Sequence, residues 1–300
     1  MSQPLVIIAG ATGDLGARIV RELSSMNTKI RALTRKETPE EKIRRLSDQG
    51  VEVVEVDFNN HQSLVQGCLG GTVIISTVSG LREVIIDTQT KLINAAVEAK
   101  VPRFIPSDFA IDYTKVPEGT NRNLNFRFEF KKIADQADIQ VTSILNGAFS
   151  DMLTGVAPFV LFKIKKVLCW GPCDQLMDWT TMDDTAKYTA FAALDPKTPR
   201  FLKIAGDQVS ANNLAETMTK LSGEKYKVLR PGGLGLLNFL IAVTKRLMPT
   251  TADVFPPWQG MQYMRDQFHG LAKFDHLDND RYPMKWTTTQ DVLAAHLKNK

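Results

Sequence analysis

The chain has 300 residues, of which 43% are hydrophobic and 23% charged, and its formal net charge is +4. A chain of this length buries a large core and suits one or two domains. Lys and Arg are scattered among Asp and Glu, which excludes the basic stripe of a nucleic-acid-binding protein, so no direct nucleic-acid partner is expected. The longest apolar stretch, residues 234–243, is too short to span a bilayer, and no membrane partner is expected.

The first residues predict a turn that binds a phosphate. An apolar strand over residues 5–9 runs directly into glycines spaced G-x-x-G-x-x-G, and an amphipathic helix follows. Glycines let the backbone approach a ligand, and the free N–H groups of the helix start point at its negative charge. An ordinary strand-to-helix turn is the alternative. A dinucleotide is the expected ligand, held by Gly10, Thr12, Gly13, Asp14, Leu15 and Gly16.

Alternating segments in the first half predict an α/β fold. Strand-like runs are expected at residues 5–9, 29–34, 51–56, 72–78, 103–106 and 140–145. Amphipathic helices are expected between most of them, at residues 40–49, 61–68, 86–99 and 126–137. Such alternation indicates a doubly wound (Rossmann) parallel sheet with its ligand at the carboxyl ends of the strands.

The second half is less regular. We expect residues 1–150 to form an NAD(P)-binding domain, and residues 151–300 a smaller, mostly helical substrate lobe with segments that return to the sheet. Helices are predicted at residues 149–163, 180–194 and 210–222, the last with Ser210 as its cap and Gly223 as its stop. Short strands are predicted at residues 201–205 and 225–228.

The residues after the second strand favour NADP(H) over NAD. An NAD site usually has an acidic residue there, whereas this chain has Arg35 and Lys36. A carboxylate would repel the 2′-phosphate of NADP, and a guanidinium can clamp it with two hydrogen bonds. Asp57, after the third strand, either accepts from the adenine amino group or caps a helix. Thr77, Val78 and Ser79, at the end of the fourth strand, are expected beside the ribose and pyrophosphate.

Several segments together carry a family resemblance. The resemblance is found in Gly10–Gly16, residues 34–35, 89–96 and 103–109, Asn146-Gly147 and residues 179–184. In these segments the chain resembles the NmrA-like and isoflavone-reductase-like group of atypical short-chain dehydrogenases. The segment 103–109, RFIPSDF, is similar to the family's RF-I/L-PSEFG, with Asp108 for Glu and Ala110 for Gly. The resemblance implies an NADP-binding Rossmann domain and a smaller substrate lobe, with Asn146 among the cofactor-binding residues. Pro106, Ser107, Asp108 and Phe109 are expected under the nicotinamide ribose.

The source of a proton is a separate question from the cofactor. None of the 5 tyrosines has a lysine four residues later, so the usual Tyr-x-x-x-Lys pair is absent. Reductases of the resembled family use a lysine on the helix before the sixth strand, and an ungapped count places Arg127 there. Arginine does not release its proton near neutral pH. Lys131, one helical turn away, is the catalytic candidate, Lys132 is less favoured, and a purely structural role for these lysines remains open.

Two functional hypotheses follow. The first is an NADPH-dependent reductase of a small aromatic or apolar carbonyl or enone compound, whose pocket is lined by Phe149, Met152, Trp258, Met261, Tyr263 and Met264 unless these belong to the core. The second is a catalytically silent NAD(P)-sensing regulator of NmrA type with a protein partner. The 4 dispersed histidines indicate no metal site.

The cysteines bear on the compartment. There are 3 of them, and the close pair Cys169 and Cys173 is expected to remain as two unpaired thiols around a turn. This usage, together with an N-terminus that leaves no room for a signal peptide, favours the cytoplasm.

Overall fold

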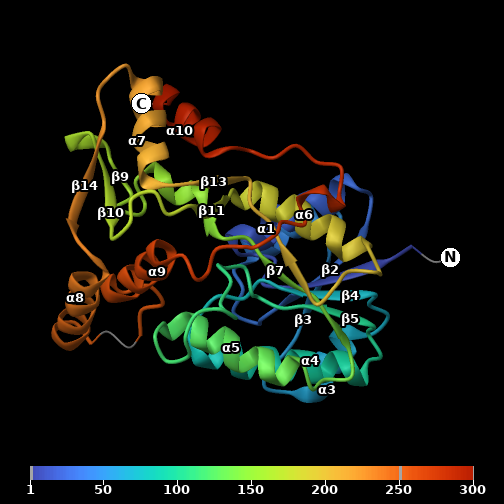
Figure 1. The fold of residues 1–300 in the computed structure, drawn as a ribbon. Helices are drawn as coiled ribbons and strands as arrows, with labels where there is room; N and C mark the ends of the chain where they lie inside the picture. Colours follow the sequence, from blue (N-terminus) through green and yellow to red (C-terminus); the bar gives the residue numbers. More distant parts are fainter. Residues whose placement is uncertain (1–2, 250–251, 300) are drawn as a thin grey trace. The chain divides into compact units, whose positions relative to one another are not determined.

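The structure is a computed structural model that describes residues 3–249 and 252–299 (Figure 1). The strands are β1 Leu5–Ala9, β2 Lys29–Thr34, β3 Glu52–Glu55, β4 Val73–Ser76, β5 Arg103–Ile105, β6 Gln140–Val141, β7 Ser143–Leu145, β8 Ala148–Phe149, β9 Val160–Leu161, β10 Lys166–Trp170, β11 Met177–Thr180, β12 Phe201–Lys203, β13 Asp207–Val209 and β14 Lys227–Gly232. The α-helices are α1 Asp14–Ser25, α2 Glu40–Ser47, α3 His61–Cys68, α4 Gln89–Glu98, α5 Arg122–Ala134, α6 Met182–Leu194, α7 Ala211–Ser222, α8 Leu234–Leu247, α9 Pro257–His269 and α10 Thr289–Lys298. A π-helical turn, Glu83–Thr88, precedes α4, and 3-10 turns occur at Ser150–Thr154, Phe162–Ile164 and Asn279–Arg281. None of the helices within residues 3–249 and 252–299 has the length and apolar character needed to cross a membrane.

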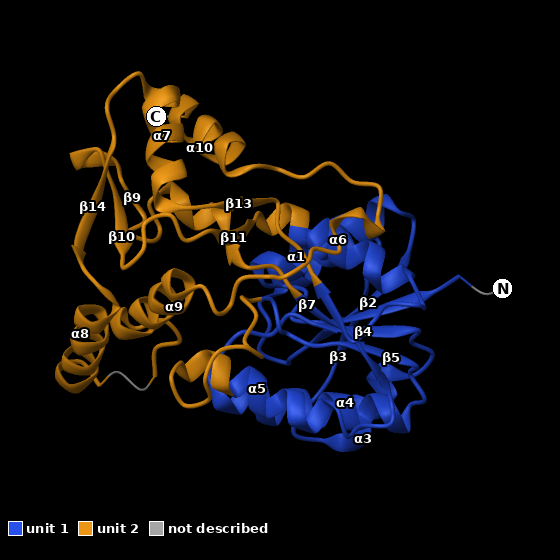
Figure 2. Ribbon diagram, viewed as in Figure 1, with its two compact units in different colours: residues 1–109, 126–144, 185–202 blue, residues 110–125, 145–184, 203–300 orange. Residues whose placement is uncertain are grey.

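The chain divides into two compact units, which Figure 2 colours separately. Unit 1 contains residues 1–109, 126–144 and 185–202, and unit 2 contains residues 110–125, 145–184 and 203–300. The chain therefore passes between the units several times instead of crossing once near residue 150. The expected division into domains at residue 150 stays a prediction.

Unit 1 is built on a parallel sheet with the strand order β3-β2-β1-β4-β5-β6. In Figure 1, α3, α4 and α5 lie on one face of this sheet, and α1 and α6 lie on the other. The expected doubly wound fold is thus confirmed. The strand order reverses between β1 and β4, where Ala9 pairs with both Leu33 of β2 and Ser76 of β4. In such sheets ligands bind outside the carboxyl ends of the strands at this reversal.

The core of unit 1 follows from its apolar pattern. Residues 6–9 of β1 are fully buried because helices cover both faces of the sheet, and α1 turns Ile19, Val20 and Leu23 toward it. Arg103 of β5 is also buried, and its guanidinium donates to the carbonyl oxygens of Ala192 and Ala193 at 2.7 and 2.8 Å. These are among the last carbonyls of α6, which lack partners within the helix, so the charge caps that helix.

Unit 2 has its own core, centred on Trp179, which packs edge-on against Phe159 with ring centroids 5.0 Å apart. It contains α7 to α10 and also two three-stranded sheets, β14-β10-β9 and β13-β11-β8, most of whose strands were not expected. The helix predicted over residues 149–163 is wrong. Gly155, with a φ of +109°, ends a short 3-10 turn there, and β9 follows. The helix predicted over residues 210–222 is confirmed, with Ser210 and Asn213 forming a capping box.

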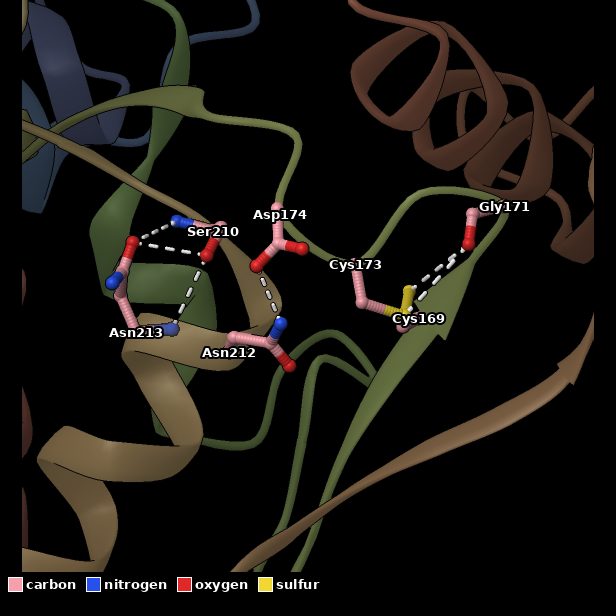
Figure 3. The surroundings of a disulfide bond; sticks show 7 residues. All are labelled: Cys169, Gly171, Cys173, Asp174, Ser210, Asn212 and Asn213. Carbon is pink, nitrogen blue, oxygen red and sulfur yellow. Dashed lines mark hydrogen bonds between the residues drawn. A yellow bond between two sulfur atoms is a disulfide. The ribbon is translucent and has the colours of Figure 1, made fainter.

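Cys169 and Cys173 form a disulfide, so the expectation of two unpaired thiols is wrong (Figure 3). The cause is the turn between them: Gly171 adopts a φ of +78°, and the two Cα atoms come within 5.7 Å, a separation that a disulfide spans. The bond ties the end of β10 to the loop that reaches the start of α7, where Asp174 accepts from the Asn212 amide at 2.6 Å (Figure 3).

Candidate functional site

The glycine loop after β1 has the geometry of a close strand-to-helix turn. Gly10 has a φ of +90°, and the Gly13 N–H donates to the Gly10 carbonyl at 3.0 Å. A Cβ on Gly16 would collide with that carbonyl and lie 2.7 Å from Thr77 Oγ1. Because α1 starts at Asp14, its first N–H groups have no partner within the helix and open at the strand reversal. The same first turn contains Asp14, whose carboxylate is paired with Arg18 at 2.8 Å.

Two cations follow β2 beside this loop. The Arg35 N–H donates to Thr38 Oγ1 at 3.2 Å, which fixes the backbone of the turn and leaves the guanidinium exposed. Within residues 3–249 and 252–299, the side chains of Arg35 and Lys36 have no hydrogen-bond or ion-pair partner. Strand β2 pairs with β1 up to Leu33, so both cations lie at the same edge of the sheet as the glycine loop. This edge therefore offers unpaired positive charge to an anionic ligand.

Hydrogen bonds fix the backbone directly after β3 and β4. The Asp57 carboxylate accepts from the Asn59 N–H at 2.8 Å, and Asn60, not Asp57, caps α3. Thr77 donates through its N–H and its Oγ1 to the Ala9 carbonyl at 2.8 and 3.2 Å, which joins the end of β4 to the end of β1. Val78 and Ser79 continue from there. Their expected contacts with a ribose and pyrophosphate, and that of Asp57 with adenine, stay predictions.

The segment after β5 is held by buried hydrogen bonds. The Ser107 N–H donates to Gln89 Oε1 at 2.9 Å, and Ser107 Oγ donates to the Val78 carbonyl at 2.7 Å. Asp108 is fully buried, and its Oδ2 accepts from Ser143 Oγ at 2.6 Å. Pro106 and Phe109 are buried as well. The sequence motif thus becomes a rigid edge of unit 1, fixed by α4, the end of β4 and β7.

The basic residues of α5 have different surroundings. Lys131 Nζ donates to Asp135 Oδ2 at 2.6 Å, and its side chain is 25% exposed. Lys132 Nζ lies 4.6 Å from the centre of the Phe128 ring. Arg127 is half-buried, one turn closer to the start of the helix. The catalytic role of Lys131 stays a prediction, and its amine would have to leave Asp135 in order to reach a substrate.

Asn146, directly after β7, has a buried amide whose hydrogen-bonding capacity is unused. Its backbone is fixed, because its N–H donates to the Ala110 carbonyl at 3.1 Å and its carbonyl accepts from Thr180 Oγ1 at 2.7 Å. The side chain is fully buried, and within the described residues neither Nδ2 nor Oδ1 has a partner. Unpaired buried amides are costly, so such a group fits a ligand that both donates and accepts.

A separate pocket of about 200 Å³ lies within unit 2. The loop after β5 and the helices α8 and α9 form it, and its lining residues are Val116, Pro117, Thr120, Asn238, Arg265, Asp266, His269 and Leu271. Burial raises the pKa of Asp266, although its contacts with Arg265 and Asn121 act to lower it. Sequence reasoning missed this pocket; the only sequence signal was the grouping of Arg265, Asp266 and His269 near the end of one helix.

The apolar residues expected to line a pocket mostly pack elsewhere. Met261 and Met264 belong to the core cluster of unit 2 or pack against it. Trp258 is buried between two cations, with the Arg122 guanidinium 4.6 Å and Lys245 Nζ 5.4 Å from its ring centre. Phe149, Met152 and Tyr263 are half-buried. For Met261 and Met264, the alternative of a core role fits the structure.

Comparisons with known proteins agree with this architecture. A sequence model of the NmrA-like family matches residues 2–231. Bifunctional pinoresinol-lariciresinol reductase 1 from Linum usitatissimum is 30% identical over 243 residues, which is 76% of this chain and 78% of that protein. The solved structure of AtPrR2 with NADP+ and (+)pinoresinol has a TM-score of 0.79 at 22% identity and covers 99% of both chains. An isoflavone reductase crystal structure has a TM-score of 0.83 at 21% identity, covering 98% of this chain and 99% of its own. With its Rossmann sheet, its glycine loop and these matches, the chain belongs to the NmrA-like family.

Proposed function

We propose that this protein is an NADPH-dependent reductase of a small aromatic or apolar compound that carries a carbonyl group or an enone. The observation that carries the proposal is the unpaired guanidinium of Arg35, at the sheet edge where the glycine loop opens. A guanidinium there suits the 2′-phosphate that distinguishes NADP(H) from NAD(H). The relatives support it, since one is named as a pinoresinol-lariciresinol reductase and a structural neighbour holds NADP+ with pinoresinol.

The residues that would hold the cofactor are those of the predicted site. The loop Gly10–Gly16 takes the pyrophosphate, Arg35 and Lys36 take the 2′-phosphate, and Asp57 and residues 77–79 flank the adenosine. Residues 106–109 support the nicotinamide ribose, and the unused amide of Asn146 supplies one donor and one acceptor. When bound, NADPH supplies the hydride, and the protein supplies orientation, exclusion of water and a proton.

The substrate class rests on the relatives, which are named as pinoresinol-lariciresinol and isoflavone reductases. Lys131 is the proposed proton donor, although its ion pair with Asp135 at 2.6 Å also favours the second candidate, an NAD(P)-sensing regulator with a protein partner. A cytoplasmic location completes the proposal. The Cys169–Cys173 disulfide weighs against that location, because such bonds are typical of oxidising compartments.

The test is nucleotide oxidation by the purified protein. Loss of NADPH absorbance would be followed with pinoresinol, an isoflavone and a simple quinone, with NADH as the control nucleotide. We expect turnover with NADPH, a weaker or absent reaction with NADH, and loss of turnover in Lys131→Ala. NADPH binding without turnover on any of these compounds would contradict the reductase and support the regulator.

Asn146→Leu tests whether the unused amide of Asn146 belongs to the cofactor site, by its effects on stability and on NADPH binding. Removing a buried amide without partners should stabilise the ligand-free protein by about 1–3 kcal/mol. The same change should weaken NADPH binding, because the donor and the acceptor are lost together. Unchanged NADPH affinity, measured by calorimetry, would remove Asn146 from the proposed site.

A further inference from the structure

A continuous line of hydrogen bonds in unit 1 joins Asp108 to Lys131. Asp108 Oδ2 accepts from Ser143 Oγ at 2.6 Å, and Ser143 Oγ accepts from Arg200 Nη1 at 2.7 Å. Arg200 Nε donates to Asp135 Oδ1 at 2.8 Å, and Lys131 Nζ donates to Asp135 Oδ2 at 2.6 Å. Residues far apart in the sequence thus form one path, in which Arg200 and Lys131 are cationic, Asp135 is acidic and Ser143 links Arg200 to Asp108.

Chemistry fixes the direction of these bonds. A guanidinium can only donate, and a serine hydroxyl has a single proton. Because Ser143 Oγ accepts from Arg200, its own proton is directed to Asp108 Oδ2. Asp108 and Ser143 are both fully buried, so no exposed water competes at this contact. Arg200 therefore sets the direction of the hydroxyl that donates to the Asp108 carboxylate.

Arg200 is itself anchored on three sides. Its backbone carbonyl accepts from the Ser143 N–H at 2.9 Å, so the two residues are neighbours through main chain and side chain alike. Its guanidinium lies 4.4 Å from the centre of the Phe201 ring and is paired with Asp135. Although partial burial acts to raise the pKa of Asp135, hydrogen bonds from Lys131 and Arg200 lower it overall.

The other end of the line is the segment proposed to support the nicotinamide ribose. Ser107 is held by Gln89 and by the Val78 carbonyl, and the adjacent Asp108 accepts from Ser143 through its side chain and donates through its N–H to the Pro106 carbonyl at 2.8 Å. The Asp108 carboxylate accepts from Ser143, so its effect on the segment runs through the backbone that it shares with Ser107. Ser143 and Arg200 thus hold the side chain that directly follows Ser107 in this segment.

We infer that Arg200 is a positioning residue of the nicotinamide end of the site, acting through Ser143 and Asp108 on residues 106–109. The inference rests on the proposed function, because it assumes that NADPH binds along this edge of unit 1. It predicts that Arg200 matters for the nicotinamide half of the cofactor and is indifferent to the adenosine phosphate half.

The test compares NADPH with 2′,5′-ADP, which has the phosphorylated adenosine and lacks the nicotinamide. In the full chain, Arg200→Gln should weaken NADPH binding about tenfold and alter the fluorescence of bound NADPH, with 2′,5′-ADP affinity within about twofold of wild type. Ser143→Ala should do the same, and the double variant should lose no more than either single variant, because both changes break one path.

Controls separate this role from general destabilisation. Arg31→Gln removes another partly buried arginine of unit 1, one paired with Glu52 at 3.0 Å, and should leave the ratio of the two affinities unchanged. If Arg200→Gln fails to fold, Arg200→Lys and Ser143→Ala carry the comparison. Equal weakening of both ligands, additive losses in the double variant, or unchanged NADPH binding would each overturn the inference. If the wild-type protein binds neither NADPH nor 2′,5′-ADP, the proposed function is overturned. If the wild type binds both and the variants keep the wild-type ratio of the two affinities, only the inference about Arg200 is overturned.

Discussion

The residues that follow β1 and β2 and the segment that follows β5 all extend from strands of one sheet, yet the polar groups of these two regions are arranged in opposite ways. At the first, Arg35 and Lys36 have no partner within the described part of the chain, and the N–H groups of the α1 start face outward. At the second, Ser107 and Asp108 are buried and hydrogen-bonded to Gln89, Val78 and Ser143. Under the proposed function, the phosphates of the cofactor would meet open charge, and its nicotinamide end would meet a preorganised, buried segment.

The strongest way to break the phosphate end is Gly16→Ala. The added Cβ would meet the Gly10 carbonyl and Thr77, so the turn must open, at a cost of about 1–3 kcal/mol in unfolding free energy. We expect NADPH binding to be lost in calorimetry. Gly260→Ala is the control, because no atom lies within 4 Å of its Cβ position. Wild-type affinity in Gly16→Ala would show that this turn does not hold the cofactor.

Arg35→Ser tests the open charge itself. Loss of charged hydrogen bonds worth about 1.5–3 kcal/mol should reduce NADPH affinity roughly 10- to 100-fold and leave NADH affinity unchanged. The wild-type preference for NADPH should also fall as salt is added, because the guanidinium is exposed. Arg44→Ser, in the last turn of α2, is the matched exposed control. A parallel loss for both nucleotides would assign Arg35 a structural role.

Gln89→Leu tests the buried, hydrogen-bonded segment after β5. Gln89 is fully buried, and its loss leaves the Ser107 N–H without its acceptor, which should lower the unfolding free energy by about 1–3 kcal/mol. NADPH affinity should fall while 2′,5′-ADP affinity is retained. Gln66→Leu, on the exposed side of α3, should change neither quantity. Unaltered stability in Gln89→Leu would mean that the segment does not depend on this contact.

Asp135→Asn should give the smallest effect. Because Lys131 and Arg200 lower the pKa of Asp135, this carboxylate stabilises the folded protein above its ordinary pKa, and the contribution disappears as the pH falls through the lowered value. The group is partly exposed, so the loss at neutral pH should stay below about 1 kcal/mol. Thermal unfolding should therefore separate the variant from wild type at pH 7 and bring them together in strong acid. A difference that grows with acidity would contradict the assignment.

Sequence reasoning was most accurate where burial alone decides the structure. The limits of β1 and β2 were predicted correctly, because each apolar run ends at a glycine or a charged residue. Of the strands of unit 2, β14 was predicted in part, whereas β8, β9 and β13 were missed because they are short and have no clear alternation. Residues 149–163 have helix-like apolar spacing, but the left-handed Gly155 interrupts it.

The site could be predicted only in its local parts. The glycine loop and Arg35 are continuous with their strands, so spacing places them at the sheet edge. The Asp108–Ser143–Arg200 line joins residues 35 and 57 positions apart, and only the topology brings them together. The Cys169–Cys173 bond likewise needed the left-handed turn at Gly171, which a spacing rule does not contain.

The cap that Arg103 provides for α6 affects how this protein can be dissected. A fragment that stops near residue 150 would retain the glycine loop but lack the Ala192 and Ala193 carbonyls, leaving a guanidinium charge stranded inside the protein. It would also lack Arg200, the donor to Ser143. Because the polypeptide returns to complete unit 1 after residue 184, a simple truncation cannot isolate that unit, and any minimal version must splice residues 185–202 back in.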